Sequence, residues 1–259
     1  MKKTLYVLVI FSLMVIKVNF VLAQNNYLDK YYKSTSPIFL EKEFKNKNIL
    51  KEKIKQNKNN PMILFQAGVY YMYQVYGVLN SMEVNRKNEK EFTEKAKRLF
   101  KKAYNQKSTN PVITAWLGSA TLYSSKWGSP FNKMRNGKKG YFYLDKALQL
   151  APNNIQVRAI RIRSIVNLPP KYFPGVLKDI KQDTKFLIEK IENDKKLLND
   201  KYFKTTLYLC YFYRARTLIR LKENKKEAYK LLEKIPKESL FYSKAINLKE
   251  KNNKNKLKK

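Results

Sequence analysis

The stretch Tyr143-Leu-Asp-Lys-Ala-Leu-Gln-Leu-Ala-Pro-Asn-Asn154 decides the fold that this sequence predicts. Small and apolar residues recur there at the spacing of one helix face, at Gly140, Leu144, Ala147 and Leu148. Pro152 cannot continue a helix, and Asn153-Asn154 are turn formers. We therefore predict a helix that packs this face against a neighbour and ends at Pro152.

Two pairs of helices are predicted between Pro61 and Pro152. The first helix of each pair contains a small or apolar pair of residues, Ala67-Gly68 in one and Leu117-Gly118 in the other. The second helices carry a small, a large and again a small residue, which are Ala96, Phe100 and Ala103, then Gly140, Leu144 and Ala147. Small residues let two helices approach closely, so each pair is expected to fold as a hairpin.

Two more pairs follow. The third comprises helices at Ile155–Val166 and at about Gly175–Ile191, and the fourth lies between Ala215 and Ile235 and ends at Pro236. The polar segment 80–91 is expected to be a longer loop or a helix extension, and segment 194–199 a polar connector. Residues 24–60 are interpreted as a degenerate N-terminal helical pair, residues 237–248 as a capping helix, and residues 249–259 as a basic disordered tail.

This pattern over residues 61–236 resembles the tetratricopeptide repeat (TPR). The segments Leu117-Gly-Ser-Ala120, Leu144-Asp-Lys-Ala147 and Leu168-Pro-Pro170 are also similar to those of uncharacterised exported bacterial TPR-like proteins. The resemblance implies an all-α fold, a right-handed solenoid of about four antiparallel helix pairs. It indicates a fold and does not indicate an activity.

TPR-like proteins bind extended peptides along the concave face formed by the first helix of each pair. The corresponding positions form an apolar and aromatic partner-binding groove: Met62, Phe65, Val69, Met72, Tyr73, Ala115, Ser119, Leu122 and Tyr123. Ordinary core packing is the competing interpretation of each of these side chains. The resemblance thus implies a protein-protein interaction or scaffold protein, with the partner unidentified.

The N-terminus reads as an export signal. Lys2 and Lys3 precede an apolar run from Leu5 to Ile16, and Val21-Leu-Ala23 provide the small residues that signal peptidase requires. The run is shorter than the roughly 18 residues that indicate a membrane span. We predict a signal peptide over residues 1–23, cleaved after Ala23, and export to the periplasm or cell envelope. An uncleaved N-terminal anchor is the alternative.

Composition restricts the chemistry. The 259 residues include no histidine and one cysteine, Cys210, which is expected to be a packed core thiol. No phosphate-binding glycine motif is present, and no catalytic residues, metal ligands or cofactor are predicted. The sequence therefore favours a binding protein over an enzyme.

The formal net charge is +35. A genome bias toward the codons for lysine is one explanation of this charge, and it predicts only a basic, solvated surface. The alternative interpretation is that the positive charge attracts an anionic partner. Export argues against nucleic acid as that partner. The alternative function is therefore a basic envelope protein that binds an anionic polymer or a lipid headgroup.

Two arginines of the predicted helix at Ile155–Val166 are candidates for a structural or a binding role. Arg158 and Arg161 fall on the face of their helix that normally carries apolar residues, which predicts either a structural ion pair with Asp145, Asp179 or Asp183 or an anion site. The spacing of Asp179 and Asp183 themselves predicts a surface ion-pair face.

The insertion Ser124–Lys139 is expected to be a long loop or a basic lip formed by Trp127, Lys133, Arg135, Lys138 and Lys139.

Overall fold

The computed structural model describes residues 40, 42–44, 47–76 and 88–254. The predicted signal peptide, about half of the N-terminal pair, residues 80–87 of the predicted segment 80–91 and residues 255–259 lie outside these described residues. Within them the fold is all-α, and no strand occurs. None of the described helices is long and apolar enough to cross a membrane.

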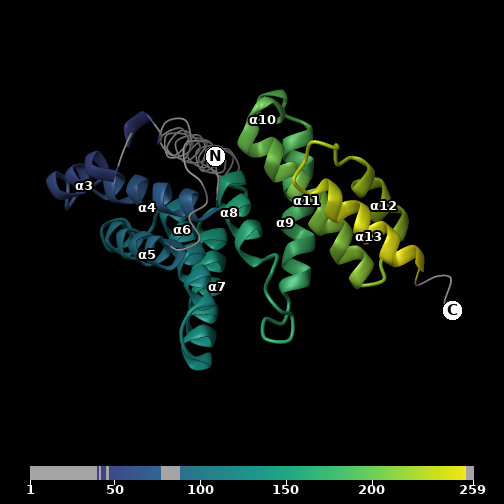
Figure 1. The fold of residues 1–259 in the computed structure, drawn as a ribbon, viewed down its shortest axis with the longest axis horizontal. Helices are drawn as coiled ribbons and strands as arrows, with labels where there is room; N and C mark the ends of the chain where they lie inside the picture. Colours follow the sequence, from purple (N-terminus) through teal and green to yellow (C-terminus); the bar gives the residue numbers. More distant parts are fainter. Residues whose placement is uncertain (1–39, 41, 45–46, 77–87, 255–259) are drawn as a thin grey trace, which may run out of the picture.

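The helices follow one another along the chain with short connections. Their bounds are α3 (Lys47–Gln56), α4 (Pro61–Tyr76), α5 (Glu89–Gln106), α6 (Pro111–Tyr123), the 3-10 turn η2 (Ser124–Lys126), α7 (Pro130–Leu150), α8 (Ile155–Ile165), α9 (Val176–Glu192), α10 (Lys195–Asn199), α11 (Lys201–Arg220), α12 (Lys225–Glu233) and α13 (Tyr242–Lys254). Figure 1 shows this order from purple α3 to yellow α13. The four helix pairs predicted between Pro61 and Pro236 are present as α4–α5, α6–α7, α8–α9 and α11–α12.

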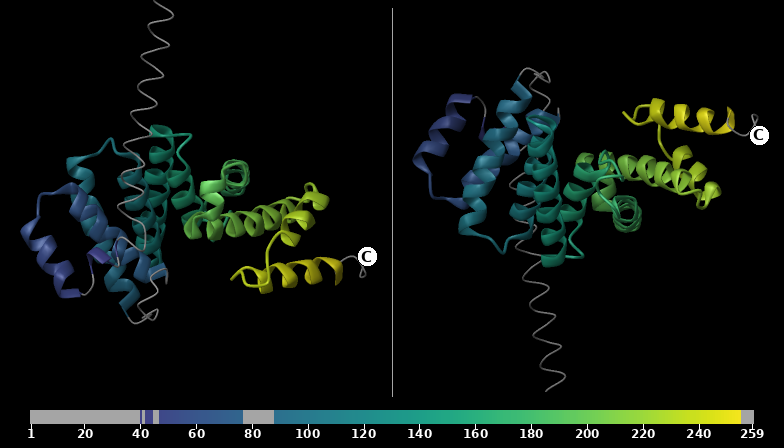
Figure 2. Two further views of the ribbon diagram at one scale, coloured as in Figure 1. Left: turned by 90° about the horizontal axis from the view of Figure 1, so that it is seen from above. Right: turned by 90° about the horizontal axis from the view of Figure 1, so that it is seen from below.

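Packing is largely sequential. Helix α4 packs along α5, α6 along α7, α8 along α9, and α11 along both α9 and α12. Helices α5 and α8 also contact α6, which links neighbouring pairs. Figure 2 shows α13 on one side of α11 and α12, both of which it contacts. Elements adjacent in sequence are thus adjacent in space.

Asparagine side chains start two of these helices. The Asn110 side chain accepts hydrogen bonds from the backbone N–H groups of Val112 and Ile113, both at 2.9 Å, and Pro111 occupies the first turn. Asn154 accepts from the N–H of Val157 at 2.8 Å. These side chains accept hydrogen bonds from backbone N–H groups that the start of a helix leaves without partners. The two asparagines therefore fix where α6 and α8 begin.

Helix α6 lies at the centre of the first half of the molecule. Every residue from Pro111 to Leu122 is buried, as expected for a helix with apolar residues on all sides. Its partner α7 approaches very closely. A Cβ atom placed on Gly140 would lie 2.4 Å from the backbone nitrogen of Leu122, and one on Gly118 would lie 2.9 Å from the Gly140 carbonyl oxygen. The small residues therefore bring α6 and α7 together as the sequence predicted.

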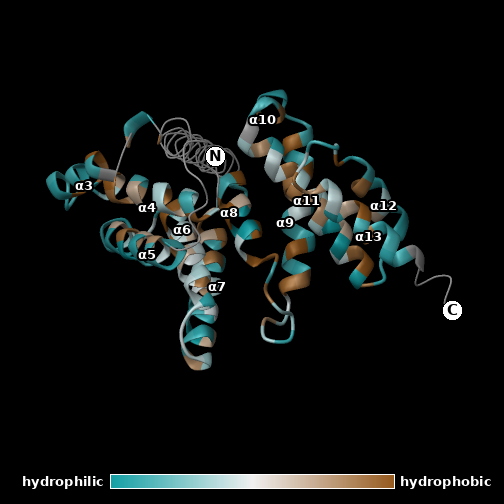
Figure 3. Ribbon diagram, in the orientation of Figure 1, coloured by the Kyte–Doolittle hydropathy of each residue, from teal (hydrophilic) through white to brown (hydrophobic). Residues whose placement is uncertain are grey.

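Three segments differ from the prediction. Most of the insertion 124–139 is helical, because α7 starts at Pro130 with Ser129 as its cap, and Figure 3 shows this end of α7 as largely polar. The predicted connector 194–199 contains the short helix α10, whose first N–H groups bond to Asp194. Helix α13 begins at Tyr242 and continues six residues beyond the predicted end at Leu248, into the predicted disordered tail.

Replacing Gly140 with alanine tests the close approach of α6 and α7. Since a methyl group would collide with backbone atoms that cannot rotate away, we expect Gly140→Ala to lower the free energy of unfolding by about 1–3 kcal/mol. Urea unfolding followed by circular dichroism measures this. The control is Lys139→Ala at the adjacent exposed position, expected to change stability by less than about 0.5 kcal/mol. Equal effects of the two variants would contradict the prediction.

Candidate binding site

The predicted groove positions lie mainly in the core. Seven of them are buried against neighbouring helices, and Met62 and Tyr123 are partly buried; the seven are Phe65, Val69, Met72, Tyr73, Ala115, Ser119 and Leu122. Core packing, the competing interpretation, therefore describes these positions better than an open groove. The physical reason is that the first helices pack against each other and against their second helices, which leaves little of this face exposed.

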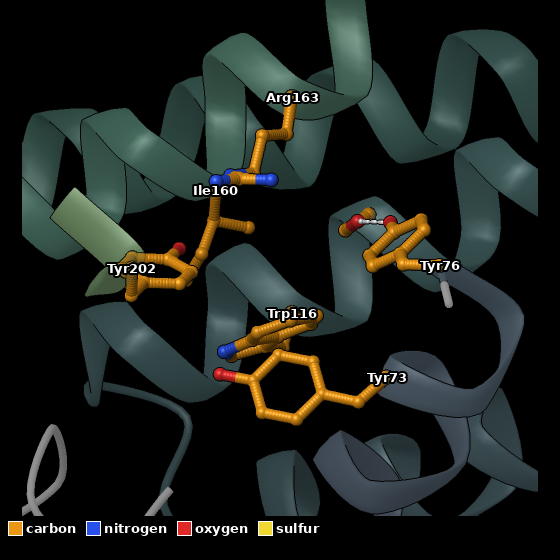
Figure 4. Close-up of a pocket in the computed structure, with 7 residues that line it drawn as sticks. Tyr73, Tyr76, Trp116, Ile160, Arg163 and Tyr202 are labelled. Carbon is orange, nitrogen blue, oxygen red and sulfur yellow. Dashed lines mark hydrogen bonds between the residues drawn. The ribbon is translucent and has the colours of Figure 1, made fainter. Parts of the chain in front are cut away.

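A small pocket remains where four helices converge (Figure 4). Helix α4 contributes Tyr73 and Tyr76, α6 contributes Trp116 and Ser119, α8 contributes Ile160 and Arg163, and α11 contributes Tyr202. We call this set the aromatic pocket. It encloses about 10 Å³, which admits about one water molecule or an oxygen atom of similar size. The pocket thus collects side chains from the first helix of each predicted pair.

Hydroxyl groups line one side of the aromatic pocket. The oxygens of Tyr76 and Ser119 lie 2.7 Å apart, and Ser164 Oγ lies 2.8 Å from Ser119 Oγ and 2.7 Å from the carbonyl oxygen of Ile160. The Tyr76 ring meets the Tyr123 ring edge to face, with centroids 5.6 Å apart. Burial raises the pKa of Tyr76 to about 12, against the opposing hydrogen bond with Ser119.

Two hydrogen-bond donors of the aromatic pocket have no acceptor in the described part of the chain. Trp116 is 3% exposed and its Nε1–H finds no partner among the described residues, and the buried Nε–H of Arg163 finds none there either. Arg163 donates from Nη2 to Thr206 Oγ1 at 2.9 Å and lies over the Tyr202 ring, with its Cζ 4.9 Å from the centroid. No described carboxylate forms an ion pair with it. A buried donor without an acceptor costs about 1–3 kcal/mol, so the pocket suits an incoming oxygen acceptor.

The predicted anion site at Arg158 and Arg161 is instead a network of ion pairs. Arg161 lies 2.5 Å from Asp183, 2.8 Å from Asp145 and 2.9 Å from Asp179, and Arg158 contacts the other Asp183 oxygen at 2.5 Å. Burial opposes the charge of Arg161, but Asp183 and Asp179 outweigh it and raise its pKa above the ordinary value. Three carboxylates occupy the guanidinium donors, so the structural ion-pair interpretation is confirmed.

Asp183 corrects one sequence interpretation. Its side chain is fully buried, whereas the spacing of Asp179 and Asp183 indicated a surface ion-pair face. The two carboxylates turn toward the helix α8 because α9 packs against it, and Tyr141 of α7 donates a hydrogen bond to Asp179. A buried carboxylate requires paired charges, and the two arginines provide them.

The predicted basic lip is a helix rather than a loop. Lys133, Arg135, Lys138 and Lys139 are exposed on α7, and Trp127 packs edge to face against Tyr123 with centroids 6.0 Å apart. The four basic side chains therefore do not gather around Trp127 as one anchored loop. Cys210 is fully buried, as predicted, and burial raises its pKa above the ordinary value.

Sequence reasoning missed Arg163, Trp116 and Tyr202 as pocket residues. Tyr73 and Ser119 were both predicted site residues, and they do line the pocket. The spacing of Ile160 and Arg163 places both on one face of α8, which was a usable signal. No spacing within one helix, however, indicates which residue of α8 faces which residue of α11.

Comparison with known proteins finds no family model, no curated protein and no solved structure that matches this chain. In the described residues no group of three or more histidine, cysteine, aspartate or glutamate side chains is arranged to hold a metal ion. The functional argument therefore depends on the geometry of the aromatic pocket and on the charge of the surrounding surface.

Replacing Arg161 with methionine tests the buried ion pairs. Arg161→Met leaves the buried Asp183 with Arg158 alone, so we expect the free energy of unfolding to fall by about 3–5 kcal/mol. The control is Lys185→Met, which breaks an exposed pair with Glu189 at 3.8 Å and should cost less than about 1 kcal/mol. Denaturant unfolding measures both. A small, equal loss in the two variants would contradict a structural role for Arg161.

The raised pKa of Tyr76 predicts alkaline sensitivity. Below pH 10 the phenol is protonated in both folded and unfolded chains; between pH 10 and about 12 the unfolded chain loses the proton first, so stability falls as pH rises. We expect Tyr76→Phe to lose less unfolding free energy than the wild type over this interval. Urea unfolding at fixed pH values measures it, with the exposed Tyr172→Phe as control. Identical pH profiles for all three proteins would refute the prediction.

Proposed function

We propose that this chain is an exported, non-enzymatic binding or scaffold protein, a TPR-like right-handed solenoid that docks a partner protein segment at the aromatic pocket. One observation carries the proposal: the pocket takes side chains from α4, α6, α8 and α11, which are the first helices of four successive pairs. In repeat proteins of this kind the first helices form the concave, partner-binding face.

The pocket also indicates the chemistry of the partner. Among the described residues the N–H groups of Trp116 and Arg163 have no acceptor, and both residues line a pocket that admits about one oxygen atom. The partner segment therefore inserts a carbonyl or carboxylate oxygen, while the rest of the segment lies outside the pocket. An acidic segment fits best, because the chain carries a net charge of +35 and Arg163 has no carboxylate partner among the described residues.

Capture of partners from the envelope fraction tests this proposal through matched variants. Cross-linking and pull-down are carried out with the wild type, with Trp116→Phe, which removes the N–H but keeps an aromatic ring, and with Arg163→Gln. We expect each variant to reduce recovery of the same partner roughly tenfold, since each removes one hydrogen bond to a polar or charged group. The control Arg98→Gln removes an exposed positive charge on α5 and should retain capture.

Salt separates the proposal from the alternative of an anionic polymer or lipid headgroup. Segment docking should survive moderate ionic strength, whereas polymer binding should weaken steeply and respond equally to Arg98→Gln and Arg163→Gln. Capture that is unchanged in Trp116→Phe and Arg163→Gln would overturn the proposed docking site. Circular dichroism confirms that each variant remains folded.

A further inference from the structure

A second, larger groove lies between the loop after α8 and the last turns of α11. Its lining includes the apolar residues Leu168, Pro169 and Leu177 and, on α11, Arg216 and Arg220; these three apolar residues are called its apolar floor. The groove has a volume of about 250 Å³, which exceeds the aromatic pocket many times over. It is open to solvent and is separate from the aromatic pocket, with which it shares no lining residue.

Arg216 and Arg220 are the unusual feature of this groove. They lie four residues apart, so they share one face of α11, and both are exposed. Neither forms an ion pair or a hydrogen bond with another described residue; Arg216 only lies near the Tyr213 ring, its Cζ 5.8 Å from the centroid. By contrast, Arg214 of the same helix contacts Glu227 at 2.6 Å. Two like charges at this spacing repel, so an anion between them would relieve the repulsion.

Uncharged donors complete the groove. Thr217 lies between the two arginines in sequence, is 3% exposed and lines the groove, yet its hydroxyl bonds to no described residue. Asn167 uses its Oδ1 to accept a hydrogen bond from the Tyr213 hydroxyl at 3.3 Å, which leaves its Nδ2–H₂ group available. No aspartate or glutamate is among the described lining residues. The groove therefore has a surplus of donors and of positive charge.

We propose that this groove binds the phosphate group of a phosphomonoester. A phosphate carries roughly two negative charges at neutral pH, which two guanidinium groups balance, and its oxygens match their paired N–H donors. Thr217 and Asn167 supply the additional donors that three terminal oxygens can accept. The apolar floor of Leu168, Pro169 and Leu177 contacts the organic remainder of the ligand. This inference does not depend on the aromatic pocket or on its protein partner.

Calorimetric titration of the full chain with glycerol phosphate and with inorganic phosphate, at constant ionic strength, tests the site. We expect saturable binding of one equivalent, weakened about tenfold or more by Arg216→Gln and by Arg220→Gln, because each removes charge-assisted hydrogen bonds. Arg98→Gln makes the same change of charge on α5 and should alter affinity less than about twofold. Thermal unfolding verifies that the variants are folded.

Vesicles distinguish the two sources of a phosphate group. Co-sedimentation with vesicles containing phosphatidic acid, but not with phosphatidylcholine alone, identifies a lipid headgroup if it requires Arg216 and Arg220; binding of the soluble esters alone identifies a small metabolite. Either result supports the site. Absence of saturable binding to every probe, or equal loss in Arg98→Gln, would overturn it. Trp116→Phe should leave phosphate binding intact. The titration therefore tests the phosphate site, and the pull-down tests partner docking, independently of each other.

Discussion

The contact between α6 and α7 at Gly118 and Gly140 is the constraint on which the first half of the structure depends. A helix backbone can lie this close to another only where no side chain intervenes, and the nearest distances leave no room for a methyl group. Helix α6 is thereby held beside α7 along its length and is buried on all sides. The position of Trp116 and Ser119, and hence the geometry of the aromatic pocket, follows from this contact.

The positions of the acidic residues determine which arginines of this basic chain are available to bind an external anion. Asp145, Asp179 and Asp183 are concentrated around Arg161, where burial makes an unpaired guanidinium costly. Arg163, two residues further along α8, has no such carboxylate among the residues that the structure describes, and neither have Arg216 and Arg220. The arginines that can accept an external anion are therefore those outside the buried network. The high net charge alone gives no indication of which ones these are.

Much of the fold followed from local rules. The turn formers Asn153-Asn154 indicated the boundary before α8, and Asn110 and Asn154 start their helices because their side chains cap the next helix whatever its partners are. The insertion at 124–139 was misread because glycine, serine and asparagine suggest a loop, whereas Ser129 and Pro130 in fact start α7. The predicted groove failed as an open surface for a different reason: periodicity identifies one face of a helix, but core and binding faces have the same apolar and aromatic composition.

By itself the sequence determined the helical class, the order and approximate bounds of the helix pairs, and the need for small residues where helices meet. These depend on spacing and on backbone chemistry within a few residues of each other. Only the tertiary structure decided that Arg158 and Arg161 neutralise Asp183, that Arg163 lies over the Tyr202 ring, and that these two line one pocket with Trp116. Such pairings join side chains of different helices, and they depend on how those helices rotate and cross, which no single helix encodes.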